Sequence, residues 1–521
     1  MSLVKNTATI GGLTLVSRVL GFARDTLAAQ FLGAGYANDA FLIAWRLPNL
    51  FRALFAEGAF ASAFIPLFNR EMGREKNGLP AALRFAEDTL SVLLPVLILF
   101  TALMMAGAGA IVWAMTGGFK ESGGPEQFRL AVELTRITFP YLPLISLVSL
   151  AGGILNSLDR FWVNAATPVL LNVCLIAGLL FFRGHTDVET ARTQAIMVSV
   201  AGAVQLAWMV QACWAAGVKL RIKRPTLTPA VRELLRIIWP AALGAGAVQF
   251  NLLISTSLAA TWLPEGSVSY LYYADRLNQL PLGLIGIGVG TAMLPGLSRQ
   301  IARGDDGGAL HTQNRAIELS LLLTLPATAA LLIASTPILR ALLQHGQFGA
   351  HATLESAAAL SAFSLGLPAY ILIKVLVPGF YARADTRTPV KIALIAMLVN
   401  LIGNFALIWR FAHVGLAFST ALSAWINAGL LYWTLRRRGH FHVDARLKRS
   451  FVRLGLATLV MAAALAALSP IVDAHVGGRL FARILWLGGF MGLAAALYFV
   501  CAFLFGALRP AELKAQMTRR A

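Results

Sequence analysis

Residues 13–70 read LTLVSRVL GFARDTLAAQ FLGAGYANDA FLIAWRLPNL FRALFAEGAF ASAFIPLFNR, which is two long apolar segments interrupted by charged residues. An isolated charge at the centre of a membrane-spanning helix costs about 2.5–3.5 kcal/mol, so several charges facing lipid would cost on the order of 10 kcal/mol. We therefore expect these charges to face a water-filled interior, except for the last arginine, which can reach the membrane surface from a helix end. Because most of them are cationic, the expected occupant is an anion. The charges are Arg18, Arg24, Asp25, Asp39, Arg46, Arg52, Glu57 and Arg70.

The composition of the whole chain predicts an all-α polytopic membrane protein. Of its 521 residues, 58% are hydrophobic and only 13% are charged, whereas soluble domains carry about 25% charged residues. The net charge of +20 comes mostly from basic residues in short loops between apolar segments. This is the positive-inside pattern of membrane proteins, so we expect no nucleic-acid partner. The three cysteines are far apart and the eight histidines show no ligand spacing, so we expect no metal and no cofactor.

Apolar windows of about 19 residues predict about fourteen transmembrane helices. Lysine and arginine gather in alternate loops, around residues 70–84, 219–224, 299–315, 383–391 and 436–449. The positive-inside rule then predicts that both termini are cytoplasmic, which requires an even number of spans. The expected spans are 8–31, 38–69, 85–115, 128–157, 163–183, 192–216, 232–262, 268–300, 313–336, 352–382, 389–411, 415–436, 450–472 and 480–507.

An internal repeat divides the chain. Pro66 and Pro295 each follow a charged segment, and each precedes a leucine and then an arginine four residues after the proline. Thr167-Pro168 and Thr388-Pro389 form a second matching pair. The repeat predicts two six-helix lobes of the same topology, residues 1–220 and 221–440, and such repeats commonly place a cavity between them. Residues 441–521 add a C-terminal helix pair without a counterpart.

The charged residues of the two lobes have helical spacing. Arg18 and Asp25 are seven residues apart, as are Asp39 and Arg46, so each pair shares a helix face. Arginine suits a diphosphate, because its planar fork donates two parallel hydrogen bonds to phosphate oxygens. We expect the carboxylates to hold the arginines when the cavity is empty. The candidate substrate-binding residues are Arg18, Arg24, Asp39, Arg46, Asn49, Arg52 and Arg276, and the supporting residues are Asp25, Glu57, Asp275, Gln279 and Lys374.

Two other features of the helices bear on the site. Pro48 lies among the candidates of the second span and is expected to kink it or open it locally. Asn251, Asn400 and Asn404 lie in the seventh and eleventh spans, where amides could coordinate a cation, although hydrogen bonding between helices is the expectation we favour.

The motifs of residues 17–60 resemble those of the MurJ (MviN) family, within the multidrug/oligosaccharidyl-lipid/polysaccharide exporter superfamily. The matching runs are SRVLGFARD at 17–25, NDAF at 38–41, RLPNLFR at 46–52 and EGAF at 57–60. YADRL at 273–277, Leu294-Pro295 and, in outline, QHGQF at 344–348 also match. The resemblance extends over nearly the whole chain.

This resemblance implies a flippase for lipid II, the undecaprenyl-diphosphate-linked peptidoglycan precursor, in the bacterial inner membrane. It implies two six-helix lobes in a V, with the last two helices forming a groove for the lipid tail. The important cavity arginines of the family correspond to Arg18, Arg24, Arg52 and Arg276, with Asp39 beside them. Peptidoglycan synthesis, cell-wall biogenesis and cell shape are the implied processes, and membrane lipids and cell-wall synthesis proteins are the implied partners. Some relatives bind sodium through carboxylates, where this chain has Asn251, Asn400 and Asn404.

We expect transport by alternating access, without covalent chemistry, so the protein is not expected to be an enzyme. Two alternatives stay open at this stage. One is a flippase for another undecaprenyl-diphosphate-linked glycan, because both substrates carry the same diphosphate. The other is a drug/cation antiporter, which the excess of arginine over acidic residues disfavours.

Overall fold

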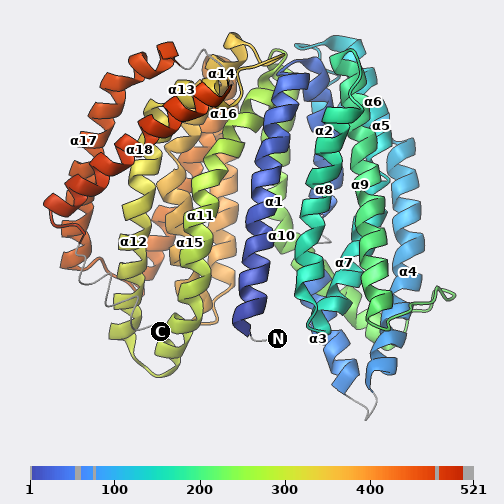
Figure 1. Ribbon diagram of the computed structural model, residues 1–521. Helices are drawn as coiled ribbons and strands as arrows, with labels where there is room; N and C mark the ends of the chain where they lie inside the picture. The colour runs from blue at the N-terminus through green and yellow to red at the C-terminus, as the bar shows by residue number, and fades with distance from the viewer. Residues whose placement is uncertain (1–2, 53–59, 74–77, 476–479, 509–521) are drawn as a thin grey trace. The chain divides into compact units, whose positions relative to one another are not determined.

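The computed structural model describes residues 3–52, 60–73, 78–475 and 480–508, whose regular elements are all α-helical (Figure 1). The fold class is therefore confirmed. The helices are α1 (Leu3–Leu32), α2 (Tyr36–Phe51), α3 (Phe60–Gly73), α4 (Gly78–Ala106), α5 (Ala108–Thr116), α6 (Gly124–Thr138), α7 (Tyr141–Ser157), α8 (Phe161–Phe181), α9 (Asp187–Ala215), α10 (Pro229–Trp262), α11 (Ser267–Ala302), α12 (Asp306–Ile333), α13 (Ser335–Leu342), α14 (Ala350–Ser364), α15 (Leu367–Tyr381), α16 (Arg387–Arg437), α17 (Ala445–His475) and α18 (Leu480–Leu504).

Several predicted spans correspond to more than one helix. The second span comprises α2 and α3, the third α4 and α5, the fourth α6 and α7, and the tenth α14 and α15. The eleventh and twelfth spans are the two halves of α16, which are separate helical segments because the backbone is not helical at Ala412, where φ is 47°. Within the described ranges, nine segments are long and apolar enough to cross a membrane. The chain is thus a multi-pass membrane protein, and the count of fourteen spans stays a prediction.

The chain forms two compact units. Unit 1 comprises Met1–Ser269 with Gly346–Phe348, and unit 2 comprises Tyr270–His345 with Gly349–Ala521. Helix α10, which we assigned to the second lobe, packs on α2, α3 and α5 of unit 1. The division into functional lobes at residue 220 stays a prediction.

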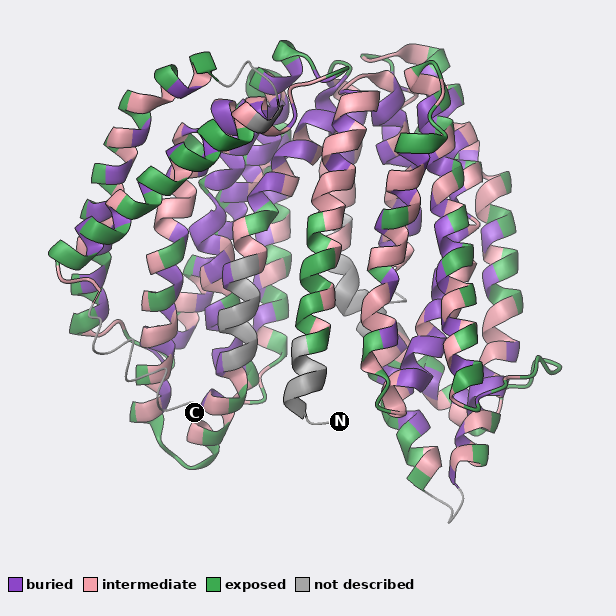
Figure 2. Cartoon of the chain, in the orientation of Figure 1, coloured by how far each residue is buried: buried purple, intermediate pink, exposed green. Residues whose placement is uncertain are grey.

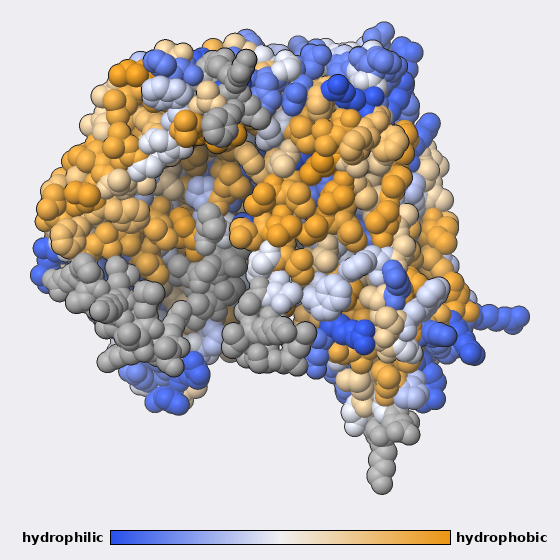
Figure 3. All heavy atoms as spheres, in the orientation of Figure 1, coloured by the Kyte–Doolittle hydropathy of each residue, from blue (hydrophilic) through white to orange (hydrophobic). Residues whose placement is uncertain are grey.

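The core of unit 1 is built on aromatic side chains at helical spacing. Phe60, Phe64 and Phe68 lie four residues apart on one face of α3 and are buried. Phe64 stacks on Phe85 of α4, with ring centroids 5.4 Å apart. Large apolar side chains also remain exposed on the long helices, among them Leu99 and Leu103 of α4 and Phe181 of α8, which is 76% exposed. Exposed residues recur along the helices in Figure 2, and Figure 3 shows hydrophobic residues over much of the face that it draws. An exposed apolar face on long helices suits contact with lipid.

Equivalent helix ends in the two units support the internal repeat. After α7, Asp159 adopts a φ of 59° and the next N–H bonds to the Leu155 carbonyl. After α15, Ala384 adopts a φ of 57° and the next N–H bonds to the Phe380 carbonyl. Both ends have the Schellman pattern, in which a left-handed residue lets the chain turn back on the last helical carbonyls.

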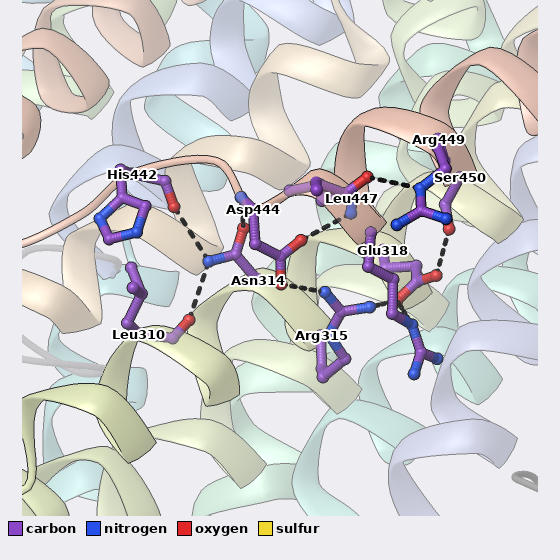
Figure 4. A network of polar contacts seen from close by, with 11 residues as sticks. Leu310, Asn314, Arg315, Glu318, His442, Asp444, Leu447, Arg449 and Ser450 are labelled. Carbon is purple, nitrogen blue, oxygen red and sulfur yellow. Dashed lines mark hydrogen bonds and ion pairs between the residues drawn. The ribbon is translucent and has the colours of Figure 1, made fainter.

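A polar network in unit 2 joins the segment before α17 to α12 (Figure 4). The Glu318 carboxylate accepts hydrogen bonds from Arg315 and Ser450 and forms an ion pair with Arg446. Asp444 pairs with Arg315 and caps α17, accepting from the Leu447 N–H at 2.6 Å. Burial acts to raise the pKa of Asp444, but the hydrogen bonds from Leu447 and Arg315 outweigh it and hold the pKa below its usual range. The network docks the start of α17 onto α12 within unit 2.

Replacing Glu318 by Ala should loosen this docking. The side chains of Glu318 and Arg315 are each only 14% exposed, and loss of a hydrogen bond to a charged group costs about 1.5–3 kcal/mol. We expect faster trypsin cleavage between residues 436 and 449 in the detergent-purified protein. Glu133→Ala is the control, because its pair with Arg192 is about half exposed and such pairs contribute little. Equal cleavage rates for the two variants would contradict the proposed docking.

Candidate functional site

Arg24 is held at the packing contact between α1 and α8. Its Nη2 lies 2.6 Å from Oδ1 of Asp25, and its Nη1 donates to Oδ1 of Asn172 at 3.1 Å. The Asn172 amide also donates to the Ser17 carbonyl at 3.0 Å, which ties α8 to the middle of α1. The side chains of Arg24 and Asp25 are 13% and 8% exposed. Asp25 therefore pairs with Arg24, whereas the seven-residue spacing placed Asp25 on the helix face of Arg18. Asn172 is a contact that sequence reasoning missed.

The candidates of α2 have two kinds of partner. Arg46 donates to the Thr256 hydroxyl and to the Leu252 carbonyl of α10. Arg52 follows the last residue of α2 and donates through Nε to Oδ1 of Asn49 at 3.0 Å. The helix runs through Pro48 up to Phe51. Arg46 thus joins two helices of unit 1, whereas Arg52 and Asn49 form a local pair one turn apart.

Asp39 is buried at the start of α2 and binds the first turn of α11. Its carboxylate accepts from the N–H groups of Gly266 and Ser269, both at 2.8 Å, and from the Ser269 hydroxyl at 2.5 Å. The amide of Asn38 donates to the same hydroxyl. A carboxylate is favourable here because the N-terminus of a helix presents unpaired N–H groups and a positive dipole end. These described contacts are with backbone and serine, and the predicted place of Asp39 beside the arginines stays a prediction.

A second cap runs in the opposite direction. Oε1 of Glu265, just before α11, accepts from the Tyr36 N–H at the start of α2 at 2.8 Å.

The N–H of Gln347 bonds to the Gln30 carbonyl at the end of α1, at 2.9 Å. Gly346 has a φ of +61°, and a Cβ there would lie 2.2 Å from the Gln30 oxygen. The glycine of the QHGQF run is therefore required by this close approach.

The unit 2 candidates lie on α11 and α15. Gln279 donates to Oδ2 of Asp275 at 2.5 Å, one turn apart, and the Arg276 guanidinium lies 5.0 Å from the Tyr272 ring centroid. Lys374 on α15 is exposed, as is Arg18 on α1 of unit 1. Glu57 lies outside the described residues. The predicted binding role of all these residues stays a prediction.

The Asn400 amide forms hydrogen bonds across the break of α16 at Ala412, as we expected, whereas the Asn404 amide bonds within its own segment. Asn400 donates to the hydroxyls of Ser419 and Thr420, and Asn404 donates to Oδ1 of Asn400 at 3.2 Å. Among the described residues, no group of three His, Cys, Asp or Glu side chains could hold a metal ion.

Comparisons with known proteins agree with these features. The family model described as "Lipid II flippase MurJ" matches residues 28–486. The "Probable lipid II flippase MurJ" of Rhizobium meliloti (strain 1021) is 44% identical over 511 residues, which covers 97% of this chain and 94% of the relative. That of Vibrio cholerae serotype O1 is 37% identical over 519 residues and 98% of both chains.

Solved structures match the fold. "Lipid II flippase MurJ, inward closed conformation" has a TM-score of 0.77 at 23% identity and covers 95% of this chain and 98% of that one. An inward-facing multidrug resistance MATE family transporter of the MOP superfamily has a TM-score of 0.69 at 15% identity, covering 83% and 97%. With a family model spanning most of the sequence and relatives above 30% identity over nearly its full length, the chain belongs to the lipid II flippase MurJ family.

Proposed function

We propose that this protein flips lipid II from the cytoplasmic to the periplasmic leaflet of the bacterial inner membrane. The observation that carries the proposal, beside family membership, is the positioned guanidinium of Arg24 within an apolar helix. Asp25 and Asn172 set its orientation, and an oriented guanidinium loses little freedom when it binds a phosphate. A diphosphate head group is the anion that fits this cation best.

The proposed mechanism is alternating access with both termini in the cytoplasm. Arg18, Arg24, Arg52 and Arg276 bind the diphosphate and sugars of the substrate in an arginine-lined cavity. The lipid tail stays in the bilayer beside α17 and α18. Rocking of the lobes then exposes the head group to the periplasm. The membrane potential favours the exit of an anion from an inside-negative cell by about 2.3 kcal/mol per charge and 100 mV.

Complementation tests this function. Cells depleted of their own lipid II flippase receive either the wild-type gene or one with Arg18, Arg24, Arg52 or Arg276 changed to Ala, and membrane protein levels are measured. We expect growth with the wild type and none with the variants at equal protein levels. A wild type that is abundant in the membrane but fails to rescue would favour another undecaprenyl-diphosphate-linked glycan. Rescue by all four variants would make the arginines structural.

Asn172 should position Arg24 without contributing charge. Replacing Asn172 by Ala removes its hydrogen bond to the guanidinium, and a hydrogen bond to a charged group contributes about 1.5–3 kcal/mol. We expect affinity for a soluble lipid II analogue to fall at least about tenfold, which corresponds to 1.4 kcal/mol. The measurement is binding of the analogue to purified protein.

Ser199→Ala is the matched control, because Ser199 also makes an interhelical hydrogen bond in unit 1, to the Ile137 carbonyl. Both variants should lower the melting temperature by similar amounts, while only Asn172→Ala should weaken binding. Equal loss of affinity in the two variants would show that Asn172 acts only through stability.

A further inference from the structure

The segment between α9 and α10, residues 218–228, forms an extended strap on unit 1. It has no helix or strand and projects beside the lower end of α9 in Figure 1. Two backbone hydrogen bonds fix it to α4, from the Arg221 N–H to Oε1 of Glu87 at 3.1 Å and from the Lys223 N–H to the Ser91 hydroxyl at 2.8 Å. Lys223 also pairs with Glu87 through Nζ at 2.6 Å. The position of the strap is therefore defined by side chains of α4.

These bonds place the strap at the edge of the apolar part of α4. The apolar run VLLPVLILF begins at residue 92, immediately after Ser91. Val96 and Leu99 on that run, and Leu103 one turn further along α4, are each more than half exposed, as expected of a face toward lipid tails. A segment bonded at the level of Ser91 lies five residues, or about 7.5 Å, below Val96, since each residue of a helix rises 1.5 Å. The strap is thus at the depth of lipid head groups.

The apolar edge of the strap extends beyond the protein. In an extended chain, alternate side chains share a face. Val218 is fully buried, Leu220 packs on the core of unit 1, and Ile222, the next residue on that face, is 69% exposed. Leu227 further along is 53% exposed. Two large apolar side chains in water beside a bilayer edge would gain by entering the bilayer.

The charges around these residues identify the lipid. Lys219, Arg221 and Arg224 are all exposed, and among the described residues their side chains have no acidic partner. The acidic residues Glu87 and Asp88 face Lys223 instead. Cations with apolar side chains between them fit a surface of phosphate groups over acyl chains.

We propose that the strap binds anionic phospholipid head groups of the cytoplasmic leaflet and inserts Ile222 into that leaflet. This rests on the proposed cytoplasmic placement of the loop, but not on which lipid-linked substrate is transported. The strap would tie the lower ends of α4, α9 and α10 to the membrane surface while other parts of the protein move.

A fluorescent label that senses polarity tests the proposal in the full-length protein. Cys174, Cys213 and Cys501 are changed to Ala, and then Ile222→Cys or Thr226→Cys is labelled with a nitrobenzoxadiazole group. Thr226 is the matched position, because it is an exposed polar residue of the same strap. The proteins are reconstituted in vesicles of phosphatidylcholine alone or with phosphatidylglycerol, and aqueous iodide is the quencher.

We expect the label at 222, but not at 226, to be shielded from iodide in the vesicles with phosphatidylglycerol. Lys219→Gln, Arg221→Gln and Arg224→Gln should each lower the ratio of bound to free strap about fivefold, as removal of one cation near an anionic surface predicts. Equal quenching at the two positions would overturn the proposal. Equal shielding in both kinds of vesicle would also overturn it, since no anionic lipid would then be needed. Complementation is measured separately, so failure of the transport proposal is distinguishable from either result.

Discussion

Replacing Arg24 by Ala should abolish rescue of flippase-depleted cells and weaken binding of a lipid II analogue at least about tenfold. The change removes a fork that can bind a phosphate through two N–H groups, and a hydrogen bond between charged groups contributes about 1.5–3 kcal/mol. It also leaves Asp25, whose side chain is 8% exposed, without the guanidinium beside it. Analogue binding by the purified variant and growth at matched protein levels are the measurements.

Two further variants separate charge from folding at this position. Arg24→Lys keeps the charge but loses the fork, so it should rescue only partly. Arg24→Ala with Asp25→Asn removes both charges of the pair, so the Asp25 carboxylate no longer stays buried without Arg24. If this double variant is stable and still inactive, the cation itself is needed. If it rescues growth, Arg24 serves only to neutralise Asp25 and our mechanism is wrong.

Arg70→Ala is the matched control for the loss of an arginine. Arg70 forms two hydrogen bonds with Glu233 on α10, yet both side chains are about 40% exposed. Exposed ion pairs contribute about 0–1 kcal/mol, so this variant should rescue as well as the wild type. A loss of rescue equal to that of Arg24→Ala would mean that removal of any arginine from these helices abolishes rescue, whatever its position.

Replacing Asp39 by Ala should produce the largest loss of stability among the candidate residues. The variant leaves the buried N–H groups of Gly266 and Ser269 and the Ser269 hydroxyl without their acceptor. Each buried donor left unpaired costs about 1–3 kcal/mol, so the total is several kcal/mol. We expect a clearly lower melting temperature in detergent and low levels of protein in the membrane.

The control for Asp39 is Glu265→Ala, because Glu265 caps α2 from the opposite direction but is exposed. Loss of an exposed cap costs about 0.5–2 kcal/mol, so its melting temperature should fall less. Asp39→Asn retains one acceptor oxygen and should lie between the two. If Asp39→Ala has the same melting temperature as the wild type but does not transport, Asp39 acts on the substrate and its cap of α11 is not needed for stability.

The relation between sequence and site differs from residue to residue. Asn49 and Arg52 are three residues apart, which helical geometry brings within reach. Arg24 and Asp25 are consecutive residues, and helical spacing does not predict their pairing. The break at Ala412 separates two helical segments, as the fall in hydropathy between the eleventh and twelfth predicted spans indicates, but a window average does not show how the backbone turns there. Asn172 was missed because the sequence shows only a single amide in an apolar helix and does not indicate which side chain that amide contacts.

By itself, the sequence determined that this protein is an all-helical membrane protein of the MurJ family, with positive charges placed inside apolar helices. Those conclusions depend on composition, on helical spacing and on local motifs, all of which are read along the chain. Only the tertiary structure decided that Asn172 orients Arg24 from 148 residues away, that Asp39 caps α11 and that α10 packs in unit 1. Helical periodicity shows which side chains share a face, but the partner of that face depends on which helices pack together and which backbone groups their ends leave unpaired.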